Sequence, residues 1–173
     1  MPKFTTSHQS FSSGIASPAA YHGVAFLGLS YKEDKKGKIL TAFDETTSSG
    51  KLIHSLLQSS SKEIALLNLV RAVPKDANGK LRYPSSREKE EGRKILKEEI
   101  KNYAPQLIFL CGKEVADCIL KQPKVVKIDD GLYSYWATKL LPIEHPSYIA
   151  VYRQKYKHEY IDKILTLMRK YAD

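Results

Sequence analysis

A histidine, a proline and a serine stand at positions 145–147, directly after the apolar run Leu140–Ile143. The run predicts a short buried strand. Pro146 restricts the residue before it, so His145 is held extended at the end of that strand. Open α/β sheets bind ligands beyond the carboxyl ends of their strands. A histidine placed there can donate a hydrogen bond to a substrate oxygen; the alternative interpretation is a capped loop histidine that meets no substrate.

Two more side chains suited to recognition are expected at the same edge. Asn68 interrupts the apolar run Ile64–Val70 near its carboxyl end, and Phe43 stands among polar residues in the loop that follows the first strand. A ring offers a stacking surface, and a carboxamide offers both a donor and an acceptor. Together with His145 they predict a pocket for a flat, hydrogen-bonding heterocycle. Taken singly, Phe43 could be ordinary core and Asn68 could satisfy backbone groups.

Strands alternate with helices along the chain, which predicts an α/β fold with three layers, α/β/α, around a central, mainly parallel four-stranded sheet. Helices are expected between the strands and at the end of the chain, and Asp129-Asp130-Gly131 marks a turn between short extended pieces. Three of the four runs interpreted as strands are Gly23–Leu29, Ile64–Val70 and Leu107–Cys111, and residues 136–143 lead into the fourth, which contains Leu140–Ile143.

Length and composition favour one domain over residues 21–173, preceded by a mobile leader over residues 1–20. Hydrophobic residues make up 42% of the chain, and no apolar run approaches the roughly 20 residues of a membrane span. The two cysteines are too few for a disulfide scaffold or a cysteine-bound cluster. We therefore expect a cytoplasmic monomer with no membrane association, no metal and no cofactor.

Basic residues outnumber acidic ones by 28 to 19, which gives a formal charge of +9. Such an excess suits a polyanionic partner such as nucleic acid, although it is also compatible with solubility alone. Part of it gathers in the turn-rich loop Pro74–Arg87, which follows Arg71 and contains Arg82 and Arg87. This loop is expected beside the pocket, where it could hold a phosphate backbone or form a solvated face.

In its motifs the chain resembles the uracil-DNA glycosylase superfamily, especially the small bacterial and archaeal branch, over roughly residues 24–153. The histidine turn and the asparagine strand are the more specific matches. The segments that carry the resemblance are Gly28, Ala42-Phe43-Asp44, Ser49–Ile53, Asn68–Pro74, Pro105–Ala116, His145-Pro146-Ser147 and Arg153.

The resemblance implies a protein that binds DNA and excises uracil or a related damaged base by hydrolysing its N-glycosidic bond. Such enzymes turn the base out of the stack and read it in a closed pocket. Phe43 would stack on the base and Asn68 would read its Watson–Crick edge, with Gly28 and Ser30 beside it. His145 would hydrogen-bond the carbonyl oxygen that gains charge as the bond breaks.

The phosphates that flank the extruded nucleotide would be held by Ser147 and Arg153. Arg82 and Arg87 of the basic loop are expected to contribute to the same task.

The chain departs from the family pattern in two places. Where relatives carry a carboxylate or Asn that positions the attacking water, this chain has Leu29 and Ser30. Glu33 and Asp44, together with Asp34, are the candidate replacements, and spacing does not choose among them. Many relatives of this branch also bind an iron–sulfur cluster through four cysteines, which this chain lacks.

Three functional classes therefore stay open. The first is a DNA glycosylase, and the second is a module of the same fold that binds DNA, a nucleotide or a base without cleavage. The third is a housekeeping α/β domain with an incidental surface charge. The absence of a carboxylate at Leu29 and Ser30 is the sequence feature that distinguishes the first class from the second.

Overall fold

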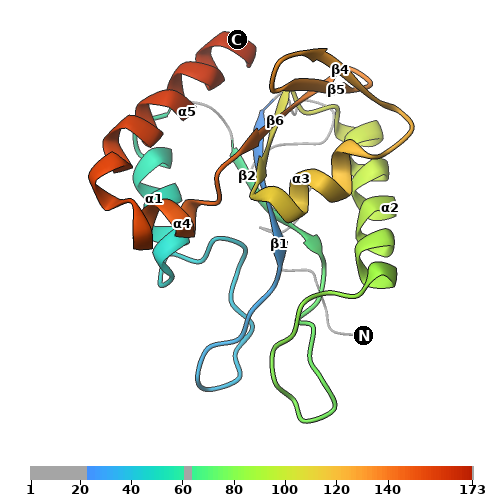
Figure 1. The fold of residues 1–173 in the computed structure, drawn as a ribbon, viewed down its shortest axis with the longest axis vertical. Helices are drawn as coiled ribbons and strands as arrows, with labels where there is room; N and C mark the ends of the chain where they lie inside the picture. The colour runs from blue at the N-terminus through green and yellow to red at the C-terminus, as the bar shows by residue number, and fades with distance from the viewer. Residues whose placement is uncertain (1–22, 61–63, 173) are drawn as a thin grey trace.

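The computed structural model describes residues 23–60 and 64–172, so the predicted leader over residues 1–20 lies outside it. Within the described residues a six-stranded mixed sheet lies between two layers of helices (Figure 1). The strands are β1 (Val24–Ser30), β2 (Ile64–Val70), β3 (Leu107–Cys111), β4 (Val125–Asp129), β5 (Leu132–Tyr135) and β6 (Thr138–Ile143). The helices are α1 (Ser48–Leu57), α2 (Ser86–Tyr103), α3 (Lys113–Leu120), α4 (Pro146–Tyr152) and α5 (Lys157–Tyr171), with a 3-10 turn η3 (Gln154–Tyr156) before α5.

The strands lie in the order β2-β1-β3-β6-β5-β4. The first four run parallel, and β5 and β4 continue the sheet as an antiparallel pair beyond β6. The layered α/β architecture is confirmed. The prediction of a four-stranded, mainly parallel sheet is corrected to a mixed sheet of six strands.

The extra strands were missed because of the turn between β5 and β6. Tyr135 pairs with Thr138, so Trp136 and Ala137 form a two-residue connection. Trp136 takes a positive φ of 53°, a conformation usually signalled by Gly or Asn rather than Trp. The sequence alone therefore treated Trp136 as the start of the segment that leads into the last strand, and it left the preceding extended pieces outside the sheet.

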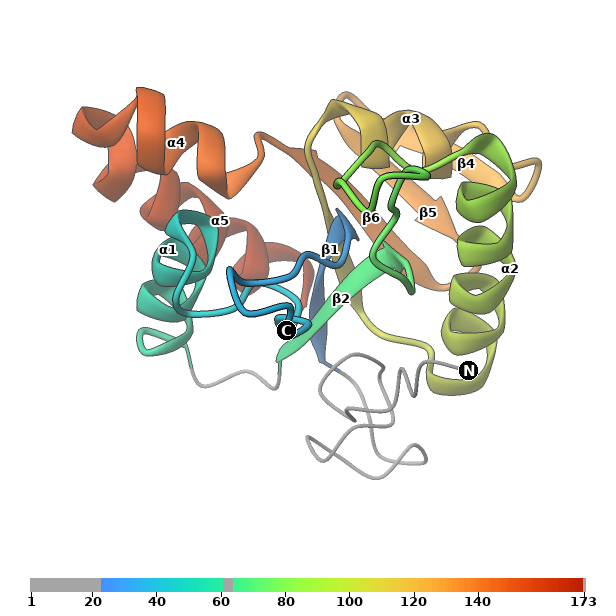
Figure 2. The ribbon, with the colours of Figure 1, turned by 90° about the horizontal axis from the view of Figure 1, so that it is seen from below.

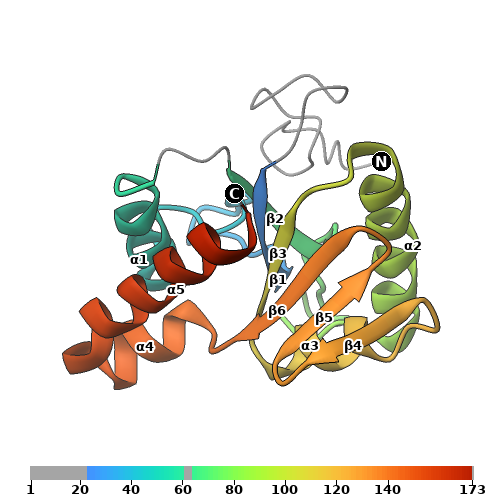
Figure 3. The same ribbon diagram turned by 90° about the horizontal axis from the view of Figure 1, so that it is seen from above.

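Alternating side chains of β1 reach opposite layers. Val24 and Phe26 pack with α1, α4 and α5, whereas Ala25 and Leu27 pack with α2 and α3. Figures 2 and 3 show α1 and α5 on one side of the sheet and α2 on the other. Both faces of the parallel strands are thus covered, which leaves their ends as the places where a ligand can enter. No helix in the described ranges is long and apolar enough to cross a membrane.

Two helix starts are capped by side chains of the preceding residue. The Thr47 side chain accepts from the Gly50 N–H at the start of α1. Ser85 and Glu88 form a reciprocal capping box at the start of α2. A helix that was not predicted, α4, begins directly after His145, with Pro146 in its first turn.

The carboxyl end of β2 is held against α2 by a close approach and a buried ion pair. A Cβ on Gly92 of α2 would lie 2.1 Å from the carbonyl oxygen of Leu69, so only glycine allows this distance. The Arg71 guanidinium meets the Glu99 carboxylate at 2.8 and 3.0 Å. Arg71, expected in the basic loop, is therefore buried and serves the packing of α2.

Replacement of Gly92 by Ala tests this packing. Ala normally stabilises a helix by about 1 kcal/mol relative to Gly, but here its methyl group meets backbone, so we expect a loss of about 1–3 kcal/mol in the free energy of unfolding. Urea unfolding measures it, with Lys97→Ala on the exposed face of α2 as the control. A Gly92→Ala variant as stable as the parent would contradict the close packing.

Candidate functional site

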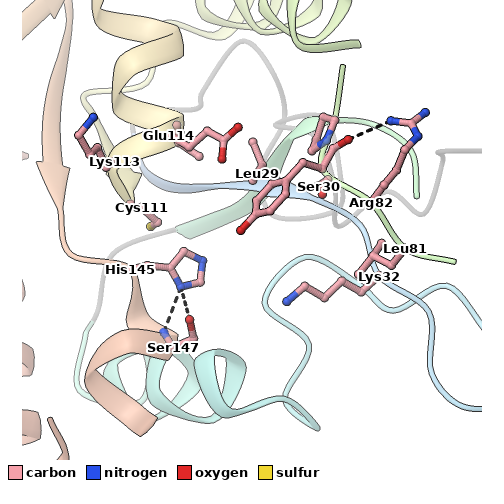
Figure 4. A pocket seen from close by; sticks show the side chains of 14 residues that line it. Leu29, Ser30, Lys32, Leu81, Arg82, Cys111, Lys113, Glu114, His145 and Ser147 are labelled. Atoms are coloured by element: carbon pink, nitrogen blue, oxygen red, sulfur yellow. Dashed lines mark hydrogen bonds between the residues drawn. The ribbon is translucent and has the colours of Figure 1, made fainter. Parts of the chain in front are cut away.

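A cavity of about 500 Å³ opens at the carboxyl edge of the sheet, between the ends of β1 and β3 (Figure 4). The strand order reverses at this point, because the chain moves from β1 outward to β2 and then returns to β3 on the other side of β1. Ligands of open α/β sheets bind at such a point. Polar side chains from four segments line the cavity: Ser30 and Lys32, Tyr83, Glu114, and His145 with Ser147.

His145 is held in one tautomer. Its Nδ1 accepts from the Ser147 backbone N–H at 3.1 Å and lies 2.7 Å from Ser147 Oγ. Because a backbone N–H only donates, Nδ1 carries no proton, and the neutral ring has its proton on Nε2. Figure 4 shows Nε2 turned away from Ser147, toward the cavity. Burial, aided by the charge of Lys32, lowers the pKa of His145 to about 4, so the ring is neutral at pH 7.

The loop that carries His145 is fixed to its neighbours. The Gly112 N–H donates to the Ile143 carbonyl at 2.9 Å, and the Tyr160 hydroxyl donates to the Glu144 carbonyl at 2.7 Å. Gly112 has a φ of +98°, and a Cβ there would lie 3.4 Å from the His145 Cβ. The positive φ accounts for glycine here, because 3.4 Å is an ordinary contact distance that a Cβ could accept.

Three of the predicted base-binding residues gather beside this histidine. Gly28 and Asn68 are direct neighbours across the β1–β2 pair. A Cβ on Gly28 would lie 2.6 Å from Asn68 Oδ1 and 3.2 Å from Phe43 Cζ, so the lack of a side chain makes room for both. The Phe43 ring lies 6.3 Å from the His145 ring, centroid to centroid. Residues far apart in the sequence thus form one cluster, which adjoins His145 but does not itself line the cavity.

Asp44 closes the loop that presents Phe43. One carboxylate oxygen accepts from the Thr41 N–H and hydroxyl, and the other accepts from the Thr46 N–H and hydroxyl. Partial burial acts to raise the pKa of Asp44, but these hydrogen bonds outweigh it and lower that pKa below its ordinary value. Phe43 itself takes a φ of +50°. The catalytic role suggested for Asp44 stays a prediction, whereas its loop-building role is observed.

The other predicted site residues divide by position. Ser30, Ser147 and Arg82 border the cavity. The Arg82 guanidinium is engaged by both oxygens of Glu88 at 2.9 Å and by the carbonyls of Lys75 and Tyr83, and Figure 4 shows it turned away from His145.

Glu33, Arg87 and Arg153 do not line this cavity. Glu33 forms an ion pair with Lys75 at 2.8 Å, and the exposed Arg87 approaches Glu91 at 3.3 Å. Arg153 stacks over the Tyr156 ring and borders a smaller cavity near α5. Their predicted roles in water activation and phosphate binding stay predictions.

The sequence did not indicate every polar residue of the cavity. Lys32, Tyr83 and Glu114 line it, although no role in the site was predicted for them. Glu114 is the only carboxylate among the described residues that line the cavity, and its Oε1 lies 3.4 Å from Lys89 Nζ. Glu114 lies in the first turn of the helix that follows β3. Only the strand order shows that this turn borders the cavity, so the sequence alone did not indicate Glu114 as a site residue.

The thiol and the acidic groups do not form a metal centre here. Burial raises the pKa of Cys111, which lines the cavity, so its thiol stays protonated at neutral pH. In the part of the chain that the structure describes, no three His, Cys, Asp or Glu side chains are grouped so that they could hold a metal ion. The described residues of the site therefore offer hydrogen bonds and charges to a ligand rather than a set of metal ligands.

Fold and site define an α/β protein with a polar ligand pocket at the switch point of its sheet. The chain belongs to the Uracil DNA glycosylase superfamily, whose family model matches residues 13–169, nearly the whole sequence. Members of this superfamily are typically DNA glycosylases, which are hydrolases, and membership supports a glycosylase-like function on DNA. No curated protein matches the chain.

The protonation of His145 is testable by NMR. The pKa of the folded state, about 4, lies below the ordinary value of 6.5, so the unfolded chain binds more protons between these values. Acidification through that window should therefore lower the free energy of unfolding, and His145→Gln should reduce this dependence. Lys32→Ala should raise the pKa of His145 yet leave it below 6.5, because burial is the larger cause. A His145 that titrates at 6.5 or above in the parent would contradict the buried, neutral ring.

Proposed function

We propose that this protein binds DNA and hydrolyses the N-glycosidic bond of a uracil or related damaged base that has been turned out of the stack. The observation that carries the proposal is the fixed tautomer of His145, with a neutral ring and its Nε2 proton available to the cavity. Family membership supports a glycosylase-like function on DNA, and the pocket at the switch point supports this edge of the sheet as the binding place. The choice of base belongs to the proposal.

In this mechanism His145 acts as a preorganised hydrogen-bond donor. As the glycosidic bond breaks, its electron pair moves into the base and negative charge grows on a carbonyl oxygen. The Nε2–H donates to that oxygen, and the hydrogen bond strengthens as the charge grows, which lowers the barrier. Because Ser147 holds Nδ1, the ring needs no reorientation during the reaction.

The cluster next to His145 would bind the base. Phe43 offers a ring for stacking, and Asn68 offers the donor and acceptor of a carboxamide at the end of β2. The bare backbone of Gly28 lets both side chains pack close to the end of β1. A base bound there adjoins the His145 ring, because the Phe43 and His145 centroids are 6.3 Å apart. Ser147, Arg153, Arg82 and Arg87 remain the proposed phosphate contacts.

Hydrolysis also needs a group that accepts a proton from water, and we assign this role to Glu114. Its carboxylate is in the cavity, whereas Glu33 pairs with Lys75 and Asp44 accepts four hydrogen bonds within its own loop. Water would form a bond from its oxygen to the sugar C1′ while the base leaves with the glycosidic electron pair. Glu114 would take the proton of that water, and the departing base would gain one from solvent.

Replacement of His145 by Ala tests the central role. Loss of one such donor typically costs about 10²–10³ in rate, so single-turnover cleavage of a uracil-containing oligonucleotide should fall by that factor. DNA affinity should change little, because the proposed phosphate contacts are other residues. Equal cleavage by parent and variant would remove His145 from the mechanism. A parent that binds DNA tightly but cleaves no uracil, hypoxanthine or xanthine substrate would favour the non-cleaving binding module, which the Leu29-Ser30 departure also suits.

The water-activating carboxylate has a matched control. Glu114→Gln removes the base but keeps the shape of the side chain, and the rate should fall by about 10²–10⁴. Glu33→Gln makes the same chemical change outside the cavity and breaks the ion pair with Lys75, so the single-turnover rate at saturating protein, which does not depend on DNA affinity, should stay within about twofold, provided the fold is retained. If Glu33→Gln alone abolishes cleavage, the residue suggested by the sequence is the base and the assignment of Glu114 is wrong.

A further inference from the structure

Two loops at the carboxyl edge of the sheet are built in the same way. Hairpin 1 (residues 32–40) follows β1, and hairpin 2 (residues 74–82) follows β2. Each contains an Asp, a Gly three residues later and a Lys directly after that Gly. Each is closed by one antiparallel bridge, Glu33 with Ile39 and Lys75 with Leu81.

The turns of the two hairpins contain equivalent side-chain hydrogen bonds. Asp34 Oδ1 accepts from the N–H groups two and four residues later at 2.8 and 2.9 Å, and Asp76 Oδ1 does the same at 2.8 and 2.9 Å. The glycines adopt φ values of +78° and +77°. Each turn is therefore ordered by its own carboxylate, before any ligand binds.

The hairpins are also joined to each other. Glu33 of hairpin 1 and Lys75 of hairpin 2 form an ion pair at 2.8 Å. The strands that precede them, β1 and β2, are neighbours in the sheet, and Figure 1 shows both loops projecting beyond the ends of these strands. The pair therefore forms one projecting surface.

The charges on this surface are unequal. The three carboxylates, Glu33, Asp34 and Asp76, are used inside the hairpins by the contacts just described. Five exposed lysines of the hairpins have ammonium groups with no ion-pair or hydrogen-bond partner among the described residues. One is Lys32, which lines the cavity, and the other four are Lys35, Lys36, Lys38 and Lys80.

The surface is continuous with the cavity. Lys32 at the base of hairpin 1 lines it, as do Leu81 and Arg82 of hairpin 2 and the adjacent Tyr83. A strand whose nucleotide entered the cavity would therefore pass beside the hairpins. The chemistry that these unpaired ammonium groups recognise at this place is a row of phosphates.

We propose that hairpins 1 and 2 act together as a grip for the sugar–phosphate backbone next to the extruded nucleotide. This inference rests on the proposed function, since it takes DNA as the substrate. The internal hydrogen bonds and the Glu33–Lys75 ion pair hold the lysine-bearing turns in place, so little ordering is needed on binding. The grip adds affinity without base selectivity, because phosphates carry no sequence information.

The test is the salt dependence of DNA binding. In the full chain, Lys35, Lys36, Lys38 and Lys80 are replaced together by Ala, and the affinity for a fluorescent duplex is measured by anisotropy across a range of salt concentrations. Each lost phosphate contact makes the slope of log K against log salt shallower by about 0.9, so four contacts would reduce it by about 3.6. The same four positions changed to Arg should restore the parental slope.

A matched control removes the same charge elsewhere. Lys97, Lys101, Lys163 and Lys170 are exposed on α2 and α5, and their joint replacement by Ala should leave the slope within about one unit of the parent. If the hairpin and control variants have equal slopes, the grip is overturned while the proposed glycosylase stands. If the parent binds no DNA even at low salt, the proposed function is overturned together with the grip. Thermal unfolding of each variant verifies that the fold is retained.

Discussion

The parallel pairing of β1 with β2 on one side and β3 on the other is the constraint on which the site depends. It puts the carboxyl ends of these strands at one edge and aligns Gly28 with Asn68. Since α1 covers one face and α2 the other, the connections after β1 and β2 leave the edge in different directions. The space left between the ends of β1 and β3 is the cavity, and the pairing of β6 with β3 brings His145 to its side.

Electrostatics at this edge favour a neutral histidine. Burial makes a charged imidazole unfavourable, and the Lys32 ammonium adds repulsion, so the pKa falls to about 4. The same positive charge that opposes a proton on His145 would attract negative charge on a base as it departs. A neutral Nε2–H donor and a nearby cation are thus compatible parts of one arrangement, whereas a protonated histidine beside the lysine is not.

Much of the fold was predictable because its signals are local. The apolar runs of β2 and β3 match the structure residue for residue, and the caps at Thr47 and Ser85 follow from side chains that compete for free N–H groups. The β4–β5 pair was not predicted as part of the sheet, because the turn that follows it is formed by Trp136, which is not a residue type that usually signals a turn. Pro146 was taken as part of a turn, although its fixed φ also suits the first turn of a helix.

The site was less predictable, because many of its contacts cross large distances in the sequence. Residue type indicated Phe43, Asn68 and His145, and the structure groups them. Charged residues were harder to assign, since their type does not reveal their partners. Arg71 forms an ion pair with Glu99, and Arg82 forms one with Glu88. Their partners lie on the next helix, where no spacing rule within the loop would place them.

The carboxylates of this protein do not lie where the family pattern leads one to expect them. After β1, where the resemblance leads one to expect an acid, the chain has Leu29 and Ser30, and the acids that follow are used to build hairpin 1. The cavity nevertheless contains a carboxylate, Glu114, from the helix after the neighbouring strand β3. Because both strands end at the same switch point, either can supply an acid to the same space. A site built on an edge shared by several strands can therefore lose a group from one strand and obtain its equivalent from another, with the sheet unchanged.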